Sequence, residues 1–108
     1  MTEKEKILIA DNEESIRRSL DAIIQHKYDD KYAILTACDG EEEVKAYKEN
    51  SSDIFIILTD NEMPKMDGLE AALEIKKEAK LKGKNIPIVL MSGRAVLLEN
   101  KFKDGKYP

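Results

Sequence analysis

The chain has 108 residues, of which 42% are hydrophobic and 37% are charged, so it can form one domain with one core, and its composition argues against disorder. Its net charge is −4 and its lysines are interspersed with acids, which argues against direct binding of nucleic acid or anionic lipid. The charged N-terminus is followed by too few apolar residues for a signal peptide or a membrane span, so we expect a cytoplasmic protein.

The first half of the chain contains two predicted strand–helix units. An apolar run predicts a buried strand at residues 6–10, and hydrophobic residues at helical spacing predict a helix at 13–26. A second strand is predicted at 32–38 and a short helix at 41–48. The side chains expected to face the core from the two helices are Ile16, Leu20, Ile23, Ile24, Val44 and Tyr47.

The second half repeats the alternation. Residues 54–60 begin with five bulky side chains without polar alternation, which predicts a strand covered on both faces. A third helix is predicted to begin near Leu69 and to end before Gly83, with a fourth strand at 87–91 and a fourth helix at 95–102. The third helix is marked by Leu69, Leu73, Ile75 and Ala79.

Strictly alternating strands and helices predict an α/β fold with a doubly wound parallel sheet and helices on both faces. In a sheet of order 2-1-3-4, the first and third strands are neighbours, and their carboxyl ends form a crevice. Asp11, Asn12 and Glu13 follow the first strand and Asp60 ends the third, so acids from distant segments should meet there. Clustered carboxylates favour a hard divalent cation such as Mg²⁺.

Each of these residues also has a structural interpretation. Asp11 could cap the following helix, and for Asn12, which lies next to that helix, capping is the stronger interpretation. Ser92 and Gly93 follow the fourth strand, where a hydroxyl and an open space could serve a phosphoryl group, although both are common turn residues. Cys38 has no partner for a disulfide and is expected to be buried near a strand end rather than catalytic.

The chain resembles the receiver domain of two-component response regulators from about residue 6 to about residue 102. The resemblance lies in ILIADNE at 7–13, LTD at 58–60, MPKMDG at 63–68 and IPIVLMSG at 86–93. It implies a flavodoxin-like receiver fold that serves as a phosphoacceptor in signalling and is not an enzyme in the usual sense.

The resemblance also implies roles for single residues. Asp60 would accept a phosphoryl group from a sensor histidine kinase or a phosphotransfer protein, and Ser92 would be the switch hydroxyl. Asp11, Asn12 and Asp60, with the backbone carbonyl of Glu62, would hold Mg²⁺. Three further residues are expected to modulate the site: Glu13 beside the metal, Gly93 beside the hydroxyl, and Arg94, which could pair with Glu62 over the acyl phosphate.

Two positions depart from the family pattern. The family has a carboxylate where this chain has Asn12, so we expect weaker Mg²⁺ binding, with Glu13 compensating in part. The family's fifth-strand lysine would lie past Pro108, and Lys106 lies in a segment without the apolar run of a strand. We therefore expect one receiver domain over residues 1–108, C-terminally truncated and without the fifth strand and its helix, although the natural chain could be longer.

Such a domain would expose a sheet edge and an apolar face, so a homodimer is expected, formed through that edge or by exchange of elements. The alternative to a phosphoacceptor is a pseudo-receiver that acts as a phosphorylation-independent interaction module. A magnesium-dependent aspartyl phosphatase is a third class, with Glu62 as the second acid, but Met63, Pro64 and the short chain argue against it. Nucleotide binding is not favoured, because no glycine-rich loop follows the first strand.

Overall fold

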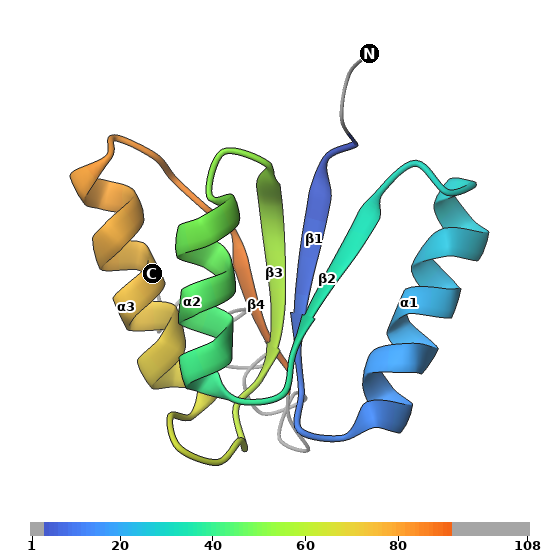
Figure 1. The fold of residues 1–108 in the computed structure, drawn as a ribbon, viewed down its shortest axis with the longest axis horizontal. Helices are drawn as coiled ribbons and strands as arrows, with labels where there is room; N and C mark the ends of the chain where they lie inside the picture. The colour runs from blue at the N-terminus through green and yellow to red at the C-terminus, as the bar shows by residue number, and fades with distance from the viewer. Residues whose placement is uncertain (1–3, 92–108) are drawn as a thin grey trace, which may run out of the picture.

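The computed structural model of the chain describes residues 4–91. It contains seven elements in alternating order, as the sequence predicts (Figure 1). They are β1 (Lys6–Ala10), α1 (Glu14–Tyr28), β2 (Ala33–Ala37), α2 (Gly40–Asn50), β3 (Ile54–Asp60), α3 (Gly68–Leu81) and β4 (Ile88–Met91). Among these helices, none is long and apolar enough to cross a membrane.

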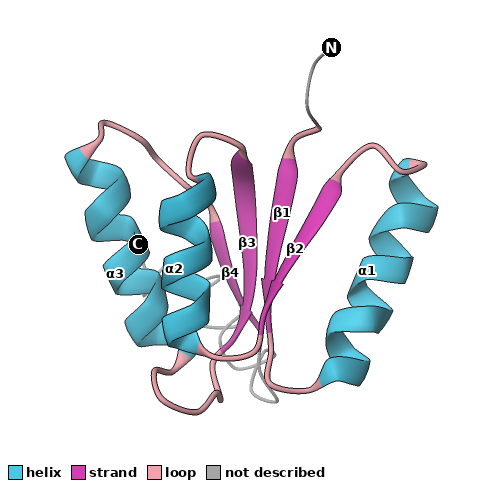
Figure 2. Ribbon diagram, viewed as in Figure 1, coloured by secondary structure: helices cyan, strands magenta, loops and turns pink. Residues whose placement is uncertain are grey.

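The four strands form one parallel sheet of order β2-β1-β3-β4, which confirms the predicted doubly wound topology. Helices α2 and α3 cover one face of the sheet and α1 covers the other (Figure 2). Ala10 of β1 lies opposite Ala37 of β2 and Thr59 of β3, and Asp60 lies opposite Met91 of β4. This register brings the carboxyl ends of all four strands to one edge of the sheet, as the flavodoxin-like receiver fold requires.

Two apolar clusters hold the layers together, and alternate residues of β1 contribute to each. Leu8 and Ala10 face α2 and α3, where Tyr47, Ile57 and Ile75 are fully buried with them. The other cluster lies on the α1 face and contains Ile7, Ile9 and Ile24. Because these side chains are closely packed, truncating a fully buried one such as Leu8 to alanine should cost about 2–5 kcal/mol.

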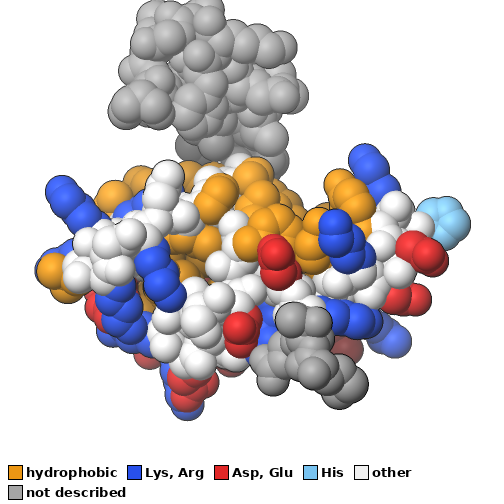
Figure 3. Space-filling model, turned by 90° about the horizontal axis from the view of Figure 1, so that it is seen from above, with side chains coloured by type: hydrophobic (Ala, Val, Ile, Leu, Met, Phe, Trp, Pro, Cys, Tyr) orange, Lys and Arg blue, Asp and Glu red, His pale blue; other side chains and the backbone are white. Residues whose placement is uncertain are grey.

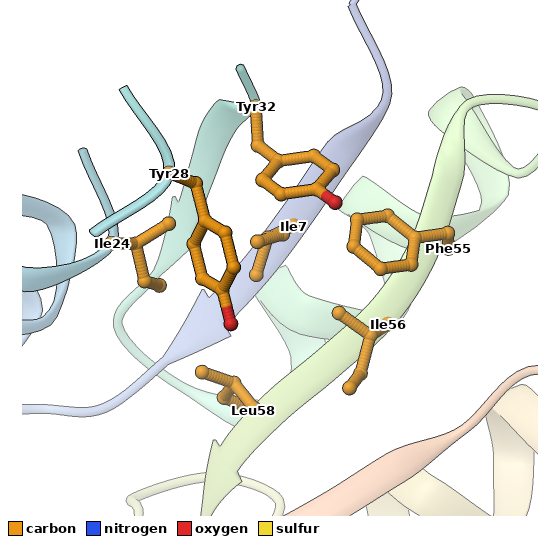
Figure 4. Close-up of a pocket in the computed structure, with 7 residues that line it drawn as sticks. All are labelled: Ile7, Ile24, Tyr28, Tyr32, Phe55, Ile56 and Leu58. Carbon is orange, nitrogen blue, oxygen red and sulfur yellow. The ribbon is translucent and has the colours of Figure 1, made fainter. Parts of the chain in front are cut away.

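The α1 face is less completely covered than the sequence predicted. Of the run that begins β3, Ile54 and Ile57 are buried, whereas the remaining side chains keep partial exposure. Figure 3 looks onto the end of the molecule where the strands begin and shows hydrophobic side chains gathered there. Between α1 and β3 they line a groove of about 260 Å³, into which the rings of Tyr28, Tyr32 and Phe55 project (Figure 4).

Several details of the helices differ from the prediction. Helices α1 and α2 extend two residues beyond their predicted ends, α1 begins one residue later than predicted, and α2 and α3 each begin one residue earlier. Ile24 and Tyr47 are buried as predicted, but Ile16, Ile23, Leu69 and Leu73 are exposed. On α3 the sheet-facing side is instead formed by Ala71, Ala72, Ile75 and Ala79, because small side chains let the helix approach the sheet closely. The predicted helix at 95–102 and Lys106 lie outside the described residues.

Candidate functional site

Asp60 is the last residue of β3 and lies half-buried at the carboxyl edge of the sheet. Its Oδ1 accepts a hydrogen bond of 3.2 Å from the backbone N–H of Glu62. Within the described residues this is the one hydrogen bond recorded for the Asp60 carboxylate, so Oδ2 is free to meet a reactant or a cation. One oxygen of the Asp60 carboxylate, Oδ1, is thus held by a hydrogen bond, whereas the other, Oδ2, stays available.

Asp11 follows β1 and is almost fully buried, with 6% of its surface exposed. Its N–H donates to the carbonyl of Ala37 at 3.0 Å, which continues the strand ladder by one residue. Its Oδ1 accepts from the N–H of Glu13 at 2.9 Å, and its carbonyl accepts from Arg17 Nη1 at 2.7 Å. Both backbone and side chain of Asp11 are therefore fixed at the same edge as Asp60.

The capping interpretations of Asp11 and Asn12 were wrong. The N-cap of α1 is Glu13, whose backbone is extended and whose side chain makes no capping hydrogen bond. The bond from the Glu13 N–H to Asp11 spans only two residues and forms a local turn before the helix begins. Asn12 is exposed, so its amide is available on the surface of the site.

The electrostatics of Asp60 show that the structure brings these acids together. Burial is the largest cause that raises the Asp60 pKa, and the negative charges of Asp11, Glu62 and Glu13 raise it further. The hydrogen bond from the Glu62 N–H acts in the opposite direction, because it stabilises the carboxylate. The side chain of Glu62 is itself exposed.

The donor set at this edge fits Mg²⁺ by its chemistry. Asp11 and Asp60 offer carboxylate oxygens, Glu62 a backbone carbonyl and Asn12 an amide oxygen, and magnesium takes oxygen ligands of these kinds. The rise in the Asp60 pKa caused by neighbouring acids is the repulsion that a cation would relieve. These residues would therefore hold the ion, at the edge where Asp60 is available for reaction.

The loop after β3 fixes the backbone of Asp60. The N–H of Asn61 donates to the carbonyl of Met91 at 3.0 Å, and its Oδ1 accepts from the N–H of Leu69 at 3.1 Å. Gly68 packs so closely that a Cβ there would lie 2.3 Å from the carbonyl oxygen of Asp60, so only glycine fits. Asp67 then caps α3 by accepting from the N–H of Glu70 at 2.8 Å.

A second polar group, not predicted from the sequence, lies at the start of α2. Asp39 caps α2 through the N–H of Glu42 at 2.8 Å, and it pairs with Lys65 of the loop after β3 at 3.7 Å. The thiol of Cys38 donates to the Glu42 carboxylate at 3.3 Å, and this bond is the main cause that raises the Cys38 pKa. Cys38 is half-buried at a strand end and its thiol stays protonated, so it is a poor nucleophile.

Two other residues near the site were not predicted, although the sequence held a weak signal for each. Arg17, which donates to the carbonyl of Asp11, lies on the first turn of a helix that directly follows Asp11, Asn12 and Glu13. Glu43 is fully buried and accepts from Thr59, and the signal for it was an acid four residues before the inward-facing Tyr47. Ser92, Gly93 and Arg94 lie outside the described residues.

Comparisons with known proteins agree with this geometry. The family model for the response regulator receiver domain matches residues 7–102. A probable transcriptional regulator, ycf27, from Guillardia theta is 35% identical over 89 residues, which are 82% of this chain and 31% of that protein. The chain thus spans about a third of the length of the curated relatives it matches.

Solved structures give the same result. A response regulator receiver domain protein from Clostridium thermocellum is 27% identical, with a TM-score of 0.72 over 94% of this chain and 75% of that chain. The response regulator TrrA from Thermotoga maritima, solved in complex with Mg²⁺ and BeF, is 30% identical, with a TM-score of 0.63 over 93% of this chain and 97% of that chain. By sequence match, strand order and overall fold, the chain belongs to the response regulator receiver domain family.

Proposed function

We propose that this chain is a phosphoacceptor, in which Asp60 takes a phosphoryl group from a sensor histidine kinase or a phosphotransfer protein. The observation that carries the proposal is the half-buried carboxylate at the end of β3, with one oxygen held by the Glu62 N–H and with acids from the loops after β1 and β3 acting on it. A response regulator with 30% identity was solved with Mg²⁺ and BeF, which supports a magnesium-dependent reaction here.

The chemistry would be nucleophilic displacement at phosphorus. An oxygen of the Asp60 carboxylate attacks the phosphoryl group, the bond from phosphorus to the donor nitrogen breaks, and an acyl phosphate forms. The raised pKa of Asp60 favours this attack, because a more basic carboxylate is a better nucleophile. When bound by Asp11, Asn12, Asp60 and the carbonyl of Glu62, Mg²⁺ would supply charge neutralisation for the transferred group.

Each chain would carry one phosphoryl group rather than convert a separate substrate. We therefore propose a cytoplasmic signalling protein and not an enzyme in the usual sense. Ser92 would donate to the phosphoryl oxygens, and Glu13, Gly93 and Arg94 would tune access to them.

The test is incubation with acetyl phosphate and Mg²⁺, followed by intact mass spectrometry. We expect a gain of one phosphoryl group, which Asp60→Asn abolishes. The matched control is Asp30→Asn, because Asp30 is exposed at the end of α1 and has a left-handed backbone that asparagine tolerates well. An absence of adduct on the native chain would favour the pseudo-receiver, whose role is binding alone.

We further propose that two copies associate through the β4 edge of the sheet or by exchange of elements. In the described part of the chain β4 pairs with β3 alone, and Val89 on it is 45% exposed. An open apolar strand edge favours pairing with another strand. Light scattering after gel filtration should give a dimer, which Val89→Lys weakens; a compact native monomer at micromolar concentration would refute the proposal.

A further inference from the structure

The first turn of α2 contacts the segment that carries Asp60, here named the phosphoacceptor segment and defined as residues 59–68. At the start of the turn, a Cβ on Gly40 would lie 2.0 Å from the carbonyl oxygen of Met66. The ion pair between Asp39 and Lys65 lies beside this contact, at 3.7 Å. At the end of the same turn Glu43 reaches across to Thr59, so α2 and its cap hold the segment at three points.

The contact between Glu43 and Thr59 is completely buried, with 0% of either residue exposed. Thr59 Oγ1 donates to Glu43 Oε1 at 2.8 Å and also lies 3.3 Å from the carbonyl oxygen of Asp60. The second oxygen, Glu43 Oε2, is buried and has no hydrogen-bond partner among the described residues. A buried ionised carboxylate with one hydrogen bond is costly, so the site suits the neutral acid.

The charge state of Glu43 is controlled by burial and not by other charges. Burial raises the Glu43 pKa from 4.5 to about 7, and the hydrogen bond from Thr59 lowers it in part. Among the described residues, charged and titratable groups on the surrounding elements do not contribute to the shift of the Glu43 pKa. Those groups are Asp11 after β1, Cys38 and Asp39 after β2, Asp60 on β3, Lys65 in the following loop and Glu78 on α3.

We propose that Glu43 is a positioning residue for Asp60: as a neutral acid it holds Thr59 and the end of β3, and loss of its proton releases the phosphoacceptor segment from α2. The inference rests on the proposed role of Asp60 as phosphoacceptor. Oε2 of an ionised Glu43 would need water or another donor, and because this oxygen is buried beneath the first turn of α2, hydrating it would displace that turn. Gly40 and Asp39 lie on or beside that turn, so their contacts with the segment move with it.

The experiment is the rate of phosphoryl uptake from acetyl phosphate and Mg²⁺ as a function of pH, for the native chain and for Glu43→Gln. Glutamine has the shape of the neutral acid and does not titrate, so the variant retains every other pH effect at the site. The neutral fraction of Glu43 falls about tenfold between pH 6 and pH 8, so the rate of the native chain relative to the variant should fall by up to about tenfold.

Two further variants separate positioning from a general structural effect. Thr59→Val removes the hydrogen bond that stabilises the ionised form, so the midpoint of the pH profile should move upward. Glu41→Gln changes an exposed acid on the same turn and should keep the native profile. Far-ultraviolet circular dichroism establishes that each variant is folded before its rate is compared.

The outcomes distinguish this inference from the proposed function. Uptake on Asp60 with the same pH profile for the native chain and Glu43→Gln overturns the inference and leaves the proposed function intact. No uptake at any pH overturns both. A falling ratio that Thr59→Val shifts to higher pH supports the positioning role.

Discussion

Replacing Glu43 by glutamine should remove one component of the pH dependence of folding stability. In the native state the Glu43 pKa is about 7, because the carboxyl group is buried, whereas the ordinary value of 4.5 applies when the chain is unfolded. Between these two values the folded chain binds more protons than the unfolded chain, so stability falls as pH rises. The contribution is complete below about pH 4.5 and is lost once pH has risen past about 7.

The size of the effect follows from the two pKa values. Between pH 5 and pH 8 the native chain should lose about 2.5 kcal/mol of unfolding free energy from Glu43 alone. Other titrating groups act equally on the variant, so the difference between native chain and Glu43→Gln isolates this amount. The assay is urea denaturation followed by circular dichroism at several pH values.

A constant difference in unfolding free energy between pH 5 and pH 8 would mean that Glu43 does not titrate in the folded chain in this range. A native chain that loses stability relative to Glu43→Gln as pH falls would mean that the folded state prefers the carboxylate, against the assignment of a neutral buried acid.

Two further predictions concern the metal site and the start of α2. Asn12→Asp should raise Mg²⁺ affinity about tenfold, because it adds one ligand charge; calorimetric titration measures it, and Asn85→Asp, on an exposed loop, controls for net charge. Gly40→Ala should destabilise the fold by about 2–3 kcal/mol, because its Cβ would meet the carbonyl of Met66. Gly83→Ala, which has open space but a φ of +68°, should cost only about 1 kcal/mol in the same denaturation assay.

The sequence was sufficient to predict the topology and the proximity of Asp11 and Asp60. Alternating apolar runs and helical periodicity indicate the order of strands and helices, and in a parallel sheet the strand ends then share one edge. It was insufficient for the faces of the helices. On α3 periodicity selected Ile75 and Ala79, which are buried, but also Leu69 and Leu73, which are exposed although leucine is more hydrophobic than the buried alanines. Which face of α3 is buried is decided by close packing against the sheet, and this packing depends on the distance between the helix and the sheet.

Glu43 was missed for a related reason. In the sequence it is one of three consecutive acids, which normally indicates a solvated helix start with favourable charge. Its spacing of four residues from the inward-facing Tyr47 was a weak signal that set it apart from its exposed neighbours Glu41 and Glu42. That spacing does not identify its partner, because Thr59 lies on a strand sixteen residues away.

The anchoring of Asp11 and Asp60 leaves the acidic edge little freedom to relax. The backbone of Asp11 is bonded to Ala37, and that of Asp60 lies within the sheet beneath Gly68. Repulsion between these acids therefore cannot be dissipated by moving the strands apart, as it could on a pair of flexible loops. The repulsion persists in the folded chain, and a proton or a cation that relieves it gains part of its binding energy from the fold itself.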